Sequence, residues 1–86
     1  MLYRIFTEDK NRQVLLDRII SPMFDSFTVI PCQGYWNGES ENSIIIEISC
    51  NNSLKPKIKA LCQHIRVWNG QESVLLQEVS VTSELL

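Results

Sequence analysis

The sequence predicts an α+β domain whose strands and helices follow one another in the order β-α-β-β-α-β. Two segments, 12–23 and 54–65, carry apolar residues at helical spacing, and strand-like segments lie before, between and after them. Asn37-Gly38 separates the two middle strands, and this dipeptide best tolerates the two positive φ angles of a type I′ hairpin turn. Right-handed crossovers then place both helices on one face of a four-stranded antiparallel sheet, the ferredoxin-like arrangement with strand order 4-1-3-2. We expect residues 1–86 to form this single domain.

The first strand and the first helix are predicted from the N-terminal residues. Leu2 to Thr7 alternates between two faces, which is typical of a strand. Asp9 can cap the helix that follows. The apolar stripe of this helix has the spacing i, i+3, i+4, i+7 and consists of Leu16, Ile19, Ile20 and Met23. Pro22 is poorly placed for a helix interior, so we expect the helix to end or kink near Ser21.

The central hairpin is predicted from Phe27 to Cys50. The second strand covers Phe27 to Trp36, and Pro31 within it favours an edge position or a bulge, because proline cannot donate a ladder hydrogen bond. The chain turns at Asn37-Gly38 or slightly later, up to Asn42. The third strand, Ser43 to Cys50, has isoleucines on both of its faces, which indicates a central strand.

The second helix and the last strand complete the domain. Asn51 to Ser53 is predicted as a loop that ends in an N-cap, and Pro56 falls in the first helical turn, where its missing N–H costs little. The helical stripe consists of Leu54, Ile58, Leu61, Cys62 and Ile65. The helix stops before Asn69-Gly70, the last strand covers Ser73 to Val81, and we expect the tail to be loose.

The composition limits the class of protein. A chain with 44% hydrophobic and 21% charged residues is typical of a small globular domain, and a net charge of −2 gives no reason to expect a membrane or a long nucleic acid as partner. No apolar run approaches the ~20 residues of a membrane span. Charged residues near the N-terminus argue against a signal peptide. Three cysteines without a C-x-x-C pair fit reduced thiols, so we expect a cytoplasmic protein, in the host cytoplasm if a phage encodes it.

The predicted fold leaves one face of the sheet without a covering helix. We expect Tyr3, Ile5 and Ile45 to lie on this bare face and to need a partner there. Folding of so short a chain buries only roughly 60 to 65% of its surface, so a monomer is marginal. The sequence therefore predicts a homo-oligomer, a dimer or a trimer, with any ligand site near the subunit boundary and formed partly by the hairpin.

Aromatic residues at the hairpin tip are the first candidates for a binding site. Tyr35 and Trp36 can supply a stacking platform for a planar ligand such as a nucleobase, and the alternative is that one of them packs in the core or at a subunit contact. Successive strand residues face opposite ways, so we expect only one of the two to line a given pocket.

Polar candidates lie elsewhere in the chain. Trp68 lies with Gln71 and Ser73 at the end of the second helix. Gln71 and Ser73 offer neutral donors and acceptors that can read amides, riboses or phosphates, and the alternative for Gln71 is to tie down a loop backbone. Arg4 lies in a predicted central strand, where a buried cation needs an anionic partner. That partner is Glu47 on a neighbouring strand or a ligand phosphate.

Catalytic and metal-binding patterns are missing from the sequence. It contains no P-loop, nucleophile elbow or dinucleotide fingerprint, and His64 has no metal-binding spacing, so we expect no cofactor and no metal. Four glutamates can each act as a general base: Glu39, Glu41, Glu72 and Glu78. A nucleophilic Cys32 beside His64 is the remaining enzyme hypothesis, and an inert core thiol is the alternative.

Short motifs in the chain resemble a family of small, uncharacterised bacterial and phage proteins. The motifs are Pro22-Met23-Phe24, Phe27-Thr28-Val29, Gly34-Tyr35-Trp36, Glu41-Asn42-Ser43 and Gln71-Glu72-Ser73-Val74. The resemblance covers roughly residues 22–81 and departs from the family pattern at Phe27, where a glycine is usual. It implies a ferredoxin-like fold and no established chemistry.

The hairpin is also similar to that of CutA-type proteins, which are trimeric ferredoxin-like domains. Tyr35-Trp36-Asn37-Gly38 and Glu41, followed by the isoleucine run, match the hairpin motif of those proteins. The similarity spans residues 29–48 and implies a trimer-forming architecture.

These observations lead to three functional hypotheses. The first is a small, oligomeric, non-catalytic protein that binds an anionic nucleotide-like ligand, such as a signalling molecule sequestered during phage infection. The second is a protein-interaction or structural module that binds through its sheet. The third is a small enzyme with a carboxylate-based site.

Overall fold

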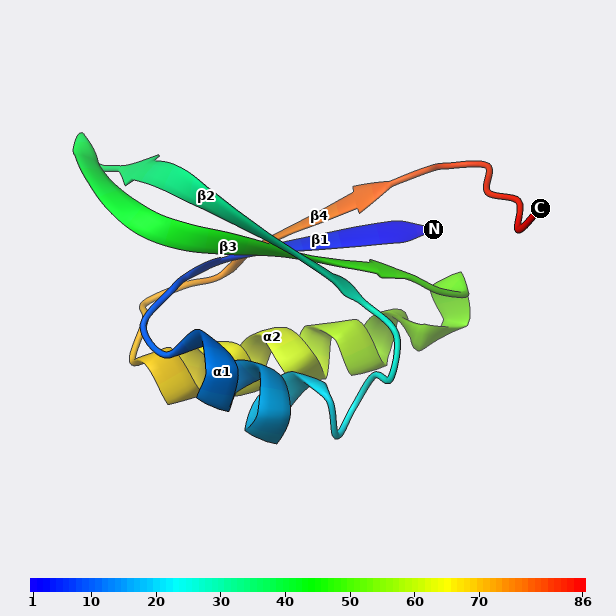
Figure 1. The fold of residues 1–86 in the computed structure, drawn as a ribbon, viewed down its shortest axis with the longest axis horizontal. Helices are drawn as coiled ribbons and strands as arrows, with labels where there is room; N and C mark the ends of the chain where they lie inside the picture. Colours follow the sequence, from blue (N-terminus) through cyan, green and yellow to red (C-terminus); the bar gives the residue numbers. More distant parts are fainter.

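A computed structural model describes residues 1–86 as two layers, a sheet and a pair of helices beneath it, with dimensions of 39 × 25 × 22 Å (Figure 1). The strands are β1 (Leu2–Glu8), β2 (Thr28–Trp36), β3 (Glu39–Ser49) and β4 (Leu75–Val79). They form one antiparallel sheet in the order β2-β3-β1-β4. The ferredoxin-like α+β fold predicted from the sequence is therefore confirmed, including the strand order.

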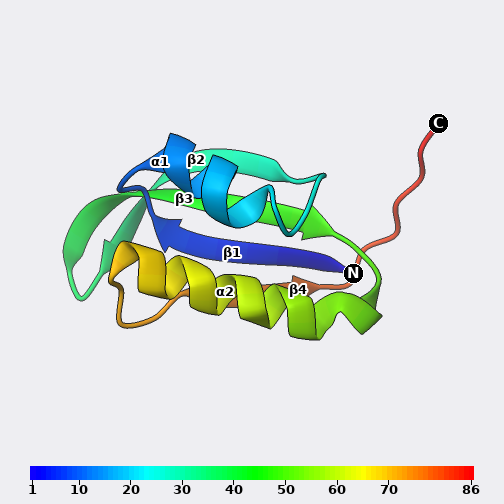
Figure 2. The same ribbon diagram turned by 90° about the horizontal axis from the view of Figure 1, so that it is seen from below.

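Both helical segments lie on the same face of the sheet. The first is a short α-helix, α1 (Arg12–Leu15), that continues as the π-helix η1 (Leu16–Ile20), and the second is α2 (Lys55–Asn69), preceded by the 3₁₀ turn η2 (Asn52–Leu54). In Figure 2, α2 runs along β1 and β4, whereas α1 lies beside β2 and β3. No helix is long and apolar enough to cross a membrane.

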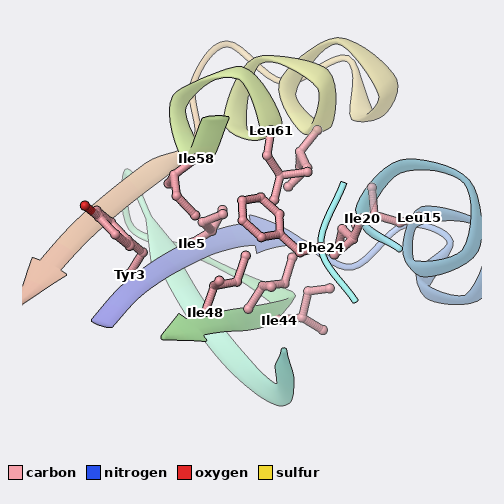
Figure 3. Packing of buried hydrophobic residues seen from close by; sticks show 11 residues of the cluster. Tyr3, Ile5, Leu15, Ile20, Phe24, Ile44, Ile48, Ile58 and Leu61 are labelled. Atoms are coloured by element: carbon pink, nitrogen blue, oxygen red, sulfur yellow. The ribbon is translucent and has the colours of Figure 1, made fainter. Parts of the chain in front are cut away.

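The core lies between the sheet and the helices, and it corrects the face predicted for the first strand. Tyr3 and Ile5 are fully buried beneath the helices, not on the bare face, because they pair with Ile48 and Ile46 of β3, which point the same way. Figure 3 shows Ile5 on the same side of the sheet as Ile58 and Leu61 of α2, and Leu15 and Ile20 of the first helix belong to the same core cluster. Both faces of β1 carry apolar residues, so the alternation alone does not decide which face is covered.

The first helix differs from the predicted α-helix in its hydrogen bonds and its start. The Ser21 N–H bonds to the Leu16 carbonyl at 2.9 Å, which is the i→i−5 bond of a π-helix. The wider π-turn brings Leu15 and Ile20 into the core together, and Leu15 was not in the predicted stripe. The prediction that Asp9 caps this helix is wrong, because Asn11 takes the N-cap position. The Asp9 carboxylate instead accepts a hydrogen bond from Arg12 Nη2 at 2.6 Å.

Other element ends shift by a few residues from the prediction. The helix ends near Ser21, as expected, and Pro31 lies on the edge strand β2 without a break in pairing. The third strand begins at Glu39 instead of Ser43, so the hairpin is longer than predicted. Ser53 is not the N-cap of α2; a 3₁₀ turn intervenes and Leu54 takes that position.

The other face of the sheet carries no helix (Figure 1). Paired residues that share this face include Phe6 with Ile45 and Phe6 with Leu75, and all three side chains are at least partly exposed. Of the three residues expected on the bare face, only Ile45 lies there.

Candidate functional site

One cleft on the sheet's bare side lies between the hairpin tip and the loop that leads into β4, beside the end of β1. Its volume is about 660 Å³. The lining residues are Phe6, Thr7, Glu8, Trp36, Asn37, Glu41, Gln71, Glu72, Ser73, Val74 and Leu75. We call this depression the Trp36 cleft. It brings together five of the residues that the sequence singled out, namely Trp36, Glu41, Gln71, Glu72 and Ser73.

The hairpin places Trp36 at one wall of the cleft. Asn37 and Gly38 both have positive φ angles, 52° and 81°, as a type I′ turn requires. Pairing continues up to Trp36 and Glu39, so the last side chain of β2 is held directly beside the turn. The predicted turn position is confirmed.

Gly34 determines how the Trp36 ring lies. A Cβ atom at Gly34 would be 2.7 Å from Trp36 Nε1 and 2.9 Å from Ser43 Oγ, so a side chain there would collide with both. The indole therefore lies against the bare backbone of Gly34. The residue paired with Gly34 is Glu41, which shares its face of the hairpin and places a carboxylate next to the ring.

The opposite wall is fixed by a partly buried hydrogen-bond network. Gly70 ends α2 in the left-handed conformation, at φ 64°, and the chain turns towards β4. Gln71 Oε1 accepts bonds from Thr7 Oγ1 at 2.5 Å and from Asn69 Nδ2 at 3.0 Å. Asn69 Nδ2 also donates to Thr7 Oγ1 and to the Glu8 carbonyl. Gln71 thus ties down the loop with its oxygen, while its amide nitrogen makes none of these bonds.

The charge of the cleft is negative. Glu8, Glu41 and Glu72 line it, and no lysine, arginine or histidine does. Lys10 Nζ is 3.7 Å from Glu8 Oε2 and donates to the Asn69 carbonyl at 2.6 Å, so it partly compensates one carboxylate. Glu41 and Glu72 take part in no ion pair, and the only hydrogen bond to the Glu41 carboxylate comes from Ser43 Oγ at 3.4 Å.

Three of the predicted site residues lie outside the cleft. Tyr35 is 70% exposed and points away from Trp36 across the strand. Trp68 lines a separate apolar groove of about 360 Å³ on the helical layer, with Ile19 and Val67. Arg4 is not buried, because β1 exposes its uncovered face; its Nε bonds Glu47 Oε2 at 2.7 Å, so a protein carboxylate fills the role that a ligand phosphate was considered for.

The structure does not bring Cys32 and His64 together, as the enzyme hypothesis requires. Cys32 pairs with Ser43 and shares the bare face, whereas His64 lies on α2 and lines the groove with Trp68, on the other side of the sheet. Burial raises the pKa of the Cys62 thiol to about 11, which keeps it protonated and unreactive near neutral pH. No group of three His, Cys, Asp or Glu side chains gathers in a way that could hold a metal ion.

Several lining residues were not predicted, chiefly Phe6, Thr7 and Leu75. They carry no motif of their own. The predicted strand order contains a usable signal, because it sets the end of the first strand between the hairpin and the start of the last strand. That neighbourhood is where the cleft forms.

A further depression of about 640 Å³ lies around Ser26, Thr28 and Glu47, at the other end of the bare face. Its lining is mostly small and polar, and Phe27 is its one aromatic ring. The Trp36 cleft combines aromatic rings, an amide and carboxylates, so it is the better candidate for a binding site.

Comparison of the chain with protein-family models, with curated proteins and with solved structures finds no match. The resemblances drawn from short motifs therefore stay predictions.

Proposed function

We propose that this chain is a non-catalytic binding protein for a small molecule with a planar ring, and that the ring is held in the Trp36 cleft. The observation that carries this proposal is the position of the Trp36 indole, which lies against Gly34 and lines the cleft together with Glu41 and Gln71. A heteroaromatic ring can stack on an indole in this position, and stacking of a base on an aromatic side chain contributes about 1–3 kcal/mol.

The polar groups of the cleft suit the edge of such a ring. The Gln71 amide nitrogen is free to donate, since Gln71 Oε1 is engaged by Thr7 and Asn69. The Ser73 hydroxyl can donate or accept, and the carboxylates of Glu41 and Glu72 accept when ionised. A ring with exocyclic N–H groups, such as a nucleobase, satisfies these groups.

The charge of the lining favours the ring part of a nucleotide over its phosphates. A phosphate inside the cleft would lie among three carboxylates, with no cation in the lining. We therefore propose that any phosphate of a nucleotide-like ligand extends out of the cleft. Sequestration of a signalling molecule during phage infection and a cytoplasmic location, which suits the three free thiols, stay predictions.

Titration of nucleosides, followed by NMR of the indole N–H groups, tests the proposal. We expect at least one of adenosine, guanosine, cytidine and uridine to shift the Trp36 indole signal and leave the Trp68 signal unchanged. Trp36→Ala should then weaken binding by about 1–3 kcal/mol. Trp68→Ala is the matched control, since Trp68 lies in a different groove.

Two results would overturn this function. If no nucleoside shifts the Trp36 signal at millimolar concentration, the cleft is not a site for planar rings. If a nucleoside is converted into a product, the third hypothesis, an enzyme with a carboxylate-based site, takes precedence.

A second candidate function, interaction with another protein chain, is favoured by the bare face of the sheet. Phe6, Ile45 and Leu75 form an apolar row there, and the charged pair Arg4–Glu47 lies on the same face. A patch that holds both members of an ion pair can be complementary to itself across a two-fold axis. We therefore propose that a second copy of this chain covers the face.

A further inference from the structure

We infer that the ligand of the Trp36 cleft is an organic cation, an aromatic ring that carries a positive charge such as a pyridinium or an alkylated purine. This inference rests on the function proposed above and narrows its ligand class. Two independent features of the cleft support it, the balance of charge in the lining and the two aromatic rings.

The negative charge of the cleft lining is not neutralised within the protein. Of the three carboxylates that line the cleft, only Glu8 has a lysine within ion-pair distance, at 3.7 Å. Glu41 and Glu72 have none, although the chain has eight lysines and arginines. Lys55, Arg4 and Arg12 are paired with carboxylates elsewhere. A ligand that brings a positive charge compensates the two remaining carboxylates.

The aromatic walls suit the same ligand. Trp36 and Phe6 both line the cleft, and Trp36 is only 41% exposed because one side of it lies against the hairpin. The face of an indole attracts a cation, more strongly than that of any other side chain. A charged ring can therefore stack on Trp36 and interact with Glu41 at the same time.

An inorganic cation fits less well. A calcium or magnesium ion takes six or more oxygen ligands, and the acidic side chains here do not converge on one point. The carboxylates lie on different elements, Glu8 at the end of β1, Glu41 on β3 and Glu72 in the loop before β4. They surround a space wide enough for a ring.

Three probes that share one ring test the inference: nicotinamide, which is neutral, 1-methylnicotinamide, which is a permanent cation, and nicotinate, which is an anion. We expect calorimetry to give a dissociation constant for 1-methylnicotinamide about tenfold lower than for nicotinamide. Nicotinate should bind most weakly. The NMR signal of the Trp36 indole reports that binding occurs in the cleft.

Variants that remove charge distinguish the effect of the carboxylates on binding from the effect of the aromatic rings. The double variant Glu41→Gln and Glu72→Gln should remove the preference for the cation, so that 1-methylnicotinamide and nicotinamide bind with equal affinity. Asp25→Asn with Glu84→Gln removes the same charge from exposed positions away from the cleft, and this control should keep the preference.

The outcomes distinguish the inference from the function on which it rests. Equal affinity for nicotinamide and 1-methylnicotinamide, both lost in Trp36→Ala, would overturn the cation and keep the binding of planar rings. Tightest binding of nicotinate would also overturn it, as would binding of a nucleoside in the cleft with no binding of any of the three probes. If neither the probes nor the nucleosides shift the Trp36 signal, both the inference and the proposed function fall.

Discussion

Gly34 shows how a single missing side chain prepares a surface for Trp36. The glycine is not needed for its backbone conformation, since only Gly38 and Gly70 among the glycines have positive φ. It is needed for close approach, because the indole and the Ser43 hydroxyl occupy the space of its Cβ. A motif read as glycine-x-tryptophan thus has a physical basis: the glycine at i accommodates the ring at i+2 on the same face of the strand.

The first prediction follows from that contact. Gly34→Ala should displace Trp36, whose ring is free to move outwards, and weaken ring binding about tenfold, within the range measured for a lost stacking contact. The free energy of unfolding should fall by only about 1–2 kcal/mol, the cost of mild overpacking at Ser43. Calorimetry and thermal melts measure the two effects.

A double-mutant cycle gives the control. In a Trp36→Ala background, Gly34→Ala should have no further effect on binding, because the ring that it displaces is already absent. A further loss of similar size in that background would show that Gly34 acts on the cleft by another route.

Tyr3 connects burial to the response of the protein to alkaline pH. Its side chain is fully buried, and its hydroxyl donates to Asn52 Oδ1 at 2.6 Å. Burial, and next the charge of Glu78, raise its pKa above 10.0. The pKa of Lys55 is raised above 10.5 by its hydrogen bond to Glu78 and by the charge of that carboxylate. Both groups keep their proton in the folded state at a pH where the unfolded chain has lost it.

The second prediction is therefore a loss of stability at high pH. Since the folded state binds more protons than the unfolded state above about pH 10, the free energy of unfolding should decrease as the pH rises through the Tyr3 and Lys55 pKa values. Tyr3→Phe should lower stability by about 1 kcal/mol near neutral pH through the lost hydrogen bond. Between pH 9 and 11, the free energy of unfolding of the Tyr3→Phe variant should decline less than that of the parent. Parallel declines in urea melts would contradict a role for Tyr3.

At the level of single residues, the sequence predicted which residues line the Trp36 cleft better than it predicted which face of a strand is buried. Four of the predicted binding residues lie together in the cleft, namely Trp36, Glu41, Gln71 and Ser73. They could be predicted because glycine, asparagine and aromatic residues mark hairpins and loops in a sequence. Tyr3 was predicted on the wrong face of its strand. When both faces of a strand are apolar, only the register with the neighbouring strand decides which one is buried.

The first helix shows why periodicity misled at the scale of elements. A search at 3.6 residues per turn selects Leu16 and Ile19, which are only partly buried, and misses Leu15. A π-turn has more residues per turn, so it realigns Leu15 with Ile20 over the sheet. No local sequence signal marks such a turn, and the packing against β3 and α2 selects it. The helix end at Ser21 was predictable, because Pro22 specifies it directly.

The third prediction concerns the hairpin turn. Gly38 has a φ of 81°, and the space around its Cα is open, so the cost of a side chain there is backbone strain alone. Gly38→Val should lower the free energy of unfolding by about 1–2 kcal/mol, since a β-branched residue is least tolerated at positive φ. The melting temperature should fall by about 4–8 °C for each kcal/mol.

Gly38→Asn is the matched control for the turn. Asparagine tolerates the left-handed region, so this variant should melt within a few degrees of the parent. If the valine and asparagine variants melt together, the strain of the turn does not contribute to stability in the way that the geometry indicates.

At the scale of the whole molecule, the strand order creates the cleft and connects it to the bare face. The order β2-β3-β1-β4 places the hairpin on one side of β1 and the loop before β4 on the other, so two segments about 35 residues apart in the chain face each other. Phe6 and Leu75 belong both to the cleft lining and to the bare face. A neighbour that covers the face therefore also touches the rim of the cleft.

The last prediction is that the protein assembles through this face. The exposed apolar area of Phe6, Ile45 and Leu75 would contribute roughly 25 cal/mol for each Å² that a second copy covers, which is substantial for a domain with so small a core. Sedimentation at low micromolar concentration should show a dimer, as expected for a patch that is complementary to itself across a two-fold axis. Ile45→Lys places a charge in the row, next to Phe6, and should give a monomer with an intact fold, as judged by circular dichroism. Tyr35→Lys is the control. Because Tyr35 is exposed on the opposite side of the hairpin, this variant should leave the assembly unchanged.

We expect ring binding to weaken together with assembly in Ile45→Lys, since the cleft shares Phe6 and Leu75 with the interface. A parent protein that sediments as a 9.9 kDa monomer would exclude the assembly, and the cleft would then have to bind its ligand with the residues of one chain alone.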